Sequence, residues 1–187
     1  MCIRMLSALA VVSLFLPLCP GQQAGVPALT VENKPELGLE ILSAEGAKVS
    51  PTEISGLKCT VRNSGHKPVE AFVVVWHVTR GSGAVQIFNH IWDNSLAKGM
   101  PKLLPGDSVT VTSGKYRSTP ENPFRGVTAQ VDYVRYTDGT STGPNAAKLA
   151  LMLDDRRMAA GWLRSYLLKV YNERGLEALL EELRPSR

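Results

Sequence analysis

His77, His90 and Asp93 are the residues of this chain whose side chains could form a chemically active group. Imidazole and carboxylate groups serve as general acids and bases or as metal ligands. A metal site usually needs three or more converging ligands, and the sequence does not establish that His77 converges with the other two. We therefore keep two interpretations. One is a partner-binding surface formed by His90, Trp92 and Asp93, and the other is a small metal-dependent or hydrolytic enzyme with a site around His77, His90 and Asp93.

The remaining motifs do not add a catalytic group. The sequence contains no H-E-x-x-H, C-x-x-C or Walker-type pattern, so we predict no cofactor. Asp138 precedes Gly139 and has the ordinary role of making a turn. Cys59 alternates with Leu57 and Val61, which indicates a small buried hydrophobic side chain. A reactive thiolate would need a nearby base and a partly open, electropositive site.

The first residues of the chain predict a signal peptide over residues 1–21. Arg4 supplies a positive charge, and an uncharged apolar run follows from Met5 to Leu18. Small residues then place the expected cleavage before Gln22. A lipid anchor on Cys19 is the less favoured alternative, because the residue before it is bulkier than a lipoprotein signal requires. We predict an exported protein, periplasmic or extracellular, with no integral membrane span in the mature chain.

The charge of the chain narrows the class of partner, and its length limits the number of domains. The formal net charge is +4, and acidic and basic residues are interspersed along the chain. Lys and Arg form no run or stripe, which argues against a nucleic-acid partner. The residues that follow the leader are enough for one domain with a hydrophobic core.

Residues 37–140 predict an antiparallel β-sandwich. Six or so strands are separated by turn signals. The run from Val69 to Val78 is nearly continuous in apolar residues, which predicts a central strand covered on both faces. In the strand from Val85 to Trp92, alternation places His90 and Trp92 on the same face. Residues 22–36 are expected to be a flexible lead-in.

Two turn motifs resemble those of bacterial immunoglobulin-like sandwiches. Val61-Arg62-Asn63-Ser64-Gly65 is similar to their V-x-N-x-G hairpin, and Leu104-Pro105-Gly106-Asp107 is similar to their L-x-P-G turn before a late strand. With the apolar strand between them, they resemble the fibronectin-type and cell-adhesion-related group of exported proteins. The resemblance covers about residues 37–140 and implies an exported binding or spacer module. It also implies that Tyr133 occupies the tyrosine-corner position.

Residues 141–187 depart from that family and predict a C-terminal helical extension. Asn145 is a good N-cap, and apolar residues recur at three- and four-residue steps from Leu149 to Val170. Gly175 is expected to end this helix, and a short second helix is expected from Leu176 to Leu183. We expect the apolar face to lie across the sandwich and complete its core. A docking helix for a partner chain is the alternative.

The sequence thus predicts a mainly β protein, an antiparallel immunoglobulin-like β-sandwich with a helical extension. The favoured function is an exported, non-enzymatic binding or interaction module. Its partner would be another envelope protein or an extracellular ligand.

Overall fold

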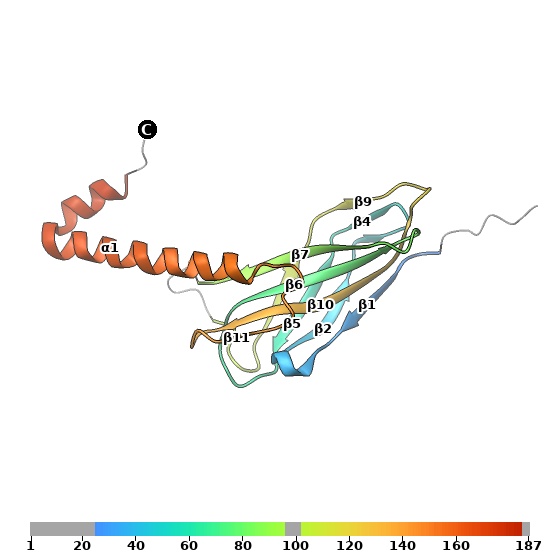
Figure 1. The fold of residues 1–187 in the computed structure, drawn as a ribbon, viewed down its shortest axis with the longest axis horizontal. Coiled ribbons are helices and arrows are strands. Elements are labelled where there is room, and N and C mark those ends of the chain that lie inside the picture. The colour runs from blue at the N-terminus through green and yellow to red at the C-terminus, as the bar shows by residue number, and fades with distance from the viewer. Residues whose placement is uncertain (1–24, 96–101, 185–187) are drawn as a thin grey trace, which may run out of the picture.

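The computed structural model describes residues 25–95 and 102–184, and in this part the protein is mainly β with one C-terminal helix (Figure 1). The predicted signal peptide and Cys19 lie outside the described residues. A short 3-10 helix spans Pro35–Leu37. The longer elements are β1 (Ala28–Glu32), β2 (Leu39–Glu45), β3 (Lys48–Val49), β4 (Glu53–Ser55), β5 (Lys58–Asn63), β6 (Val69–Arg80), β7 (Val85–Asp93), β8 (Ser108–Thr112), β9 (Tyr116–Arg117), β10 (Phe124–Tyr136), β11 (Ser141–Thr142) and α1 (Ala150–Glu182).

The larger sheet has the strand order β1-β10-β6-β7. Strand β6 is antiparallel to both of its neighbours, β10 and β7. Every residue of β6 from Val69 to Trp76 is buried, so the prediction of a central strand covered on both faces is confirmed. The edge of β10 away from β6 is shared: β1 pairs with its first half in parallel, and β11 pairs with Val134 and Arg135 further along.

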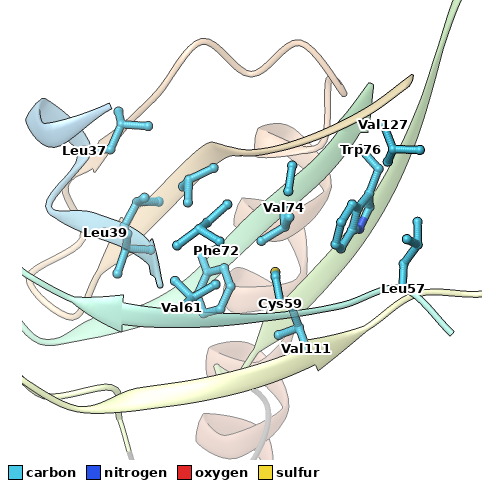
Figure 2. Packing of buried hydrophobic residues seen from close by; sticks show 14 of the residues in the cluster. Leu37, Leu39, Leu57, Cys59, Val61, Phe72, Val74, Trp76, Val111 and Val127 are labelled. Carbon is cyan, nitrogen blue, oxygen red and sulfur yellow. The ribbon is translucent and has the colours of Figure 1, made fainter. Parts of the chain in front are cut away.

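The smaller sheet, β2-β5-β8, packs face to face on the larger one, and the main hydrophobic core lies between them (Figure 2). Phe72, Val74 and Trp76 point inward from β6 because side chains alternate along a strand. They meet Cys59 and Val61 of β5 in the same core. Trp76 is fully buried and Cys59 is 1% exposed, so the prediction that both are core residues is confirmed. A third, short sheet has the order β3-β4-β9.

The expectation that residues 22–36 form a flexible lead-in is wrong for the part of this segment that the structure describes. Strand β1 lies within it and fills an edge of β10 that would otherwise be open. The Thr30 and Thr128 hydroxyls lie 2.9 Å apart across this pair. Just beyond β1, the Asn33 side chain accepts from the backbone N–H of Ile41 at 2.8 Å and donates to its carbonyl at 3.1 Å. The pairing of β1 with β10 and the contact of Asn33 with β2 together attach this segment to both sheets.

Tyr133 does not occupy the tyrosine-corner position that the resemblance implies. A register shift between Val131 and Tyr133 turns Tyr133 onto the outer face of the larger sheet, away from the main core. Its hydroxyl has no hydrogen-bond partner within the described residues. The nearby Tyr136 instead donates from its hydroxyl to the carbonyl of Leu37 at 2.9 Å.

The outer face of the larger sheet is covered by the first turn of α1. Leu153 is fully buried there against Ala71, Val73 and Val75 of β6. Beyond this turn the helix projects past the end of the sheets as an arm (Figure 1). In α1, Val170 is the other buried residue. The expectation that the whole apolar face lies across the sandwich is therefore correct only for the first turn.

The ends of α1 follow the sequence signals in part. The helix begins at Ala150 rather than at Ala146, and the Asn145 side chain accepts a hydrogen bond from the Ala150 backbone N–H at 3.0 Å. The predicted break at Gly175 is confirmed, since φ there is 81° and ψ is −174°. Among the residues that the structure describes, no helix combines the length and the apolar character that a membrane span requires.

Candidate interaction surface

The structure separates the residues that the sequence suggested as a catalytic or metal-binding group. His90 pairs with Val74 and shares its inward direction, whereas His77 points to the outer face, where its Nε2 lies 3.2 Å from Oε1 of Gln130. Opposite faces of one sheet cannot place both imidazoles on the same ligand. The site around His77, His90 and Asp93 is therefore not assembled. In the described part of the chain, no group of three or more His, Cys, Asp or Glu residues is placed to hold a metal ion.

The suggested binding surface of His90, Trp92 and Asp93 is also divided between two faces. His90 and Trp92 share the inner face, as alternation predicted, and the Trp92 ring stacks on Phe72 with 5.2 Å between the ring centroids. Partial burial lowers the pKa of His90, and a hydrogen bond with the backbone of Thr112 opposes that shift. The Asp93 side chain is 7% exposed and takes part in ion pairs at the base of α1. These three residues do not form one exposed patch.

A cluster of buried charges lies at the base of α1. The Arg135 side chain, 1% exposed, reaches Oε2 of Glu70 at 3.4 Å through Nε and Oδ1 of Asp93 at 3.5 Å through Nη2. Both carboxylates are less than one tenth exposed. Each also faces a cation from α1: Arg157 is 3.6 Å from Glu70, and Arg156 is 4.0 Å from Asp93. Strands β6, β7 and β10 are thus tied to the helix through opposite charges.

Arg135 also holds the backbone of the helix directly. Its Nη1 donates to the carbonyl oxygen of Leu153 and lies 3.4 Å from Oδ1 of Asp154. A buried charge without its partner is strongly destabilising, so this cluster is costly to break. Sequence analysis missed it because its members are far apart along the chain. Two signals were present: Glu70 sits within an apolar strand, and Arg156 interrupts the apolar stripe of the helix.

The connection from β10 to α1 is fixed by a buried carboxylate. Asp132, 1% exposed, accepts from the backbone N–H of Ala146 at 2.7 Å and from that of Ala147 at 3.0 Å. Asn145 and Lys148 have positive φ angles of 54° and 57°, which make the chain turn tightly before the helix. The direction in which α1 leaves the sheets is therefore set by polar contacts at its base.

The arm, residues 158–183 of the C-terminal segment, exposes a large apolar surface. Trp162 is 83% exposed, which is rare for the largest apolar side chain. Large apolar side chains that are at least 48% exposed follow it around and along the helix, and we call this set the arm surface: Met158, Trp162, Leu163, Tyr166, Leu168, Tyr171, Leu176, Leu180 and Leu183. Exposed apolar patches of this extent mark interaction sites in soluble proteins.

The break at Gly175 folds the end of the chain back on the arm and creates a groove. The groove has a volume of about 620 Å³, and its lining includes Leu163, Leu167 and Tyr171 of the long part and Leu179 of the short part. The ion pair between Arg174 and Glu182, 3.4 Å long, joins the two parts. A hydrogen bond to Glu182 also raises the pKa of Tyr166.

A second, more polar hollow of about 430 Å³ lies beside the turn that follows β5. Lys67 lines it, but its ammonium group already donates to Asp138 at 2.8 Å and to Thr140 at 3.2 Å. His66 and Tyr136 complete part of the lining. The arm is the larger and more apolar of these two candidate sites.

No protein-family model matches the chain, and neither does any curated protein or solved structure with which it was compared. The functional argument therefore rests on the geometry described above.

Proposed function

We propose that this chain is an exported, non-enzymatic interaction module that associates with another protein chain through its helical arm. The observation that carries the proposal is the arm surface, on which Trp162, Leu163 and Leu176 are 58–83% exposed. Leaving such side chains in water costs about 25 cal/mol for each Å² of apolar area. The binding surface is thus moved from His90, Trp92 and Asp93 to the arm.

A protein occupant is favoured over a lipid surface because apolar residues surround the arm. Trp162 is 83% exposed and is not part of the groove, whereas Leu167 and Tyr171 line it. A helix that binds in the plane of a membrane concentrates its apolar residues on one face and its charges on the other. A helix that is apolar on several sides is typically covered by several neighbouring helices.

The proposed fold of the remaining part is an immunoglobulin-like sandwich. Support comes from the contact between the two turn motifs that carry the resemblance. The carbonyl of Asn63 accepts from the Gly106 N–H at 2.8 Å, and the Asn63 N–H donates to the carbonyl of Asp107 at 2.9 Å. Asn63 is fully buried, and its side chain also donates to the carbonyls of Lys67 and Leu103. This contact gives the asparagine of the V-x-N-x-G motif a structural role in joining both turns.

Export of the chain is proposed from its first 21 residues, with cleavage before Gln22. The partner is then a protein of the envelope or the extracellular space. Mass spectrometry of the protein purified from the envelope fraction tests this route. A diacylglyceryl mass on Cys19 would show lipid anchoring instead, and an intact leader would contradict processing by signal peptidase.

Site-specific crosslinking tests the interaction. A photoreactive amino acid in place of Trp162 should form a covalent adduct with a protein in the producing cells, whereas the same group in place of Val85 should not. Val85 is a suitable control because it is 56% exposed, apolar and located on β7, away from the arm. The adduct should disappear when Leu163 is replaced by Asp in the same chain. An adduct at neither position, or one that survives Leu163→Asp, would contradict the proposal.

A further inference from the structure

We propose that the chain which covers the arm is a second copy of this protein, so that two arms pair through the arm surface. This inference rests on the proposed function and names its partner. The first argument is the amount of apolar surface. One arm already provides a two-part helical unit, in which Leu167 of the long part and Leu179 of the short part line the same groove. Two such units can cover one another as a four-helix arrangement, which is a stable way to bury helices that are apolar on several sides.

The second argument is the charge pattern of the arm. Its long part carries Arg164 and Lys169 together with one acid, Glu173, and its folded-back part carries Glu177 and Glu181. All five side chains are exposed, and none has an ion-pair partner within the described residues. Opposite charges are therefore available on two parts of the same surface. In a symmetric pair the same patch of both copies takes part, so the acidic part of each copy can face the basic part of the other.

Strand β1 enters the larger sheet at the end opposite the arm, so this segment of the described chain does not cover the arm surface (Figure 1). An anionic lipid surface would match Arg164 and Lys169 but would repel Glu177 and Glu181. A second copy satisfies both pairs of charges.

The test measures the oligomeric state of the full chain by sedimentation over a range of protein concentrations. The chain should form dimers, and Leu163→Asp should weaken the dimer by at least about tenfold in dissociation constant. Val85→Asp, which adds the same charge at a similarly exposed apolar position on β7, should leave the dimer unchanged. Circular dichroism of each variant checks that the helix is retained.

Charge exchange makes the test specific for this pairing. A chain with Arg164→Glu and Lys169→Glu, and another with Glu177→Lys and Glu181→Lys, should each dimerise about tenfold more weakly than the unmodified protein. An equimolar mixture of these two variants should recover dimers that contain one copy of each, separable by a tag on one chain. Failure of the mixture to recover, with both variants helical, would overturn the proposed pairing.

Other outcomes separate this inference from the proposed function. In one outcome, the protein stays monomeric at all concentrations while the photoreactive group at Trp162 crosslinks to a different protein. That result would overturn the proposed pairing with a second copy and would still support the proposed interaction module. Monomers that bind phosphatidylglycerol vesicles through the arm, with no protein adduct, would overturn both. A crosslinked species of twice the chain mass supports both.

Discussion

The contrast between two leucines on the same helix gives the sharpest test of where α1 packs. Leu153 is fully buried in a cluster with Ala71, Val73 and Tyr133, whereas Leu151, two positions earlier, is 71% exposed. Leu→Ala at either position removes the same atoms and changes helix propensity by the same small amount. Any difference between the two variants therefore reports burial alone.

Truncation of a buried leucine costs about 2–5 kcal/mol, because transfer free energy is lost and a cavity remains. Substitution at an exposed position usually changes stability by no more than about 0.5 kcal/mol. With a urea dependence of about 2 kcal/mol per M, Leu153→Ala should lower the unfolding midpoint by about 1–2.5 M. Leu151→Ala should stay within about 0.3 M of the unmodified chain.

The assay is urea unfolding of the full chain, followed by tryptophan fluorescence and far-ultraviolet circular dichroism at one protein concentration. A fixed concentration keeps any contribution from self-association comparable across the variants. Equal midpoints for Leu151→Ala and Leu153→Ala would refute the packing of the first turn on the outer face of the larger sheet. Loss of the helical signal alone, before the strands unfold, would show that α1 is a separate cooperative unit.

Three further predictions concern charge and burial. Arg135→Met should lower the free energy of unfolding by about 3–5 kcal/mol, because the buried carboxylates of Glu70 and Asp93 lose the most buried of their cations. The control Arg62→Met, which breaks an exposed pair, should cost at most about 1 kcal/mol in the same urea assay, and equal losses would contradict the role of burial. Burial raises the pKa of the Cys59 thiol to about 12, so native protein at about pH 8 should resist thiol reagents until it unfolds, and rapid native labelling would disprove this. Hydrogen bonds from Lys67 and a neighbouring threonine hold the pKa of Asp138 well below its usual value, which NMR titration should detect. The resulting stabilisation is present above the unfolded-state pKa and is lost as pH falls through the folded-state pKa, so Asp138→Asn should flatten the acid limb of the stability curve.

The strands near the centre of the sheets were predictable because their signals are local. Val69 to Val78 is an uninterrupted apolar run, and such a run must be covered on both faces whatever the topology. The alternation around Cys59 likewise fixes its inward direction without knowledge of its neighbours. The faces of β7 followed from the same period, which placed His90 and Trp92 together.

Features that depend on contacts between distant segments were not predictable in this way. Strand β1 is short and lies in a polar, proline-containing segment, and its place in the sheet depends on the free edge of β10. The direction of Tyr133 depends on a register shift, which moves a side chain to the other face without a change in sequence pattern. For a related reason, the sequence could not show whether His77 and His90 converge. Alternation assigns each side chain to one face of its own strand, but only the pairing register shows whether the two faces are the same.

The arm shows how far an apolar pattern on a helix can be interpreted. The stripe from Leu149 to Val170 predicts a surface that needs a cover, but the pattern contains no information about what covers it. The direction of α1 is decided at its base, where Asp132 fixes the connection from β10 and Arg135 holds the first turn of the helix. Because these buried polar contacts direct α1 past the end of the sheets, its later residues cannot reach the apolar face that Leu153 covers. The sandwich therefore leaves the apolar surface from Met158 onward exposed, and this exposure is the basis on which we propose the arm as an interaction surface. Polar residues near the helix base, more than the stripe itself, determine that exposure.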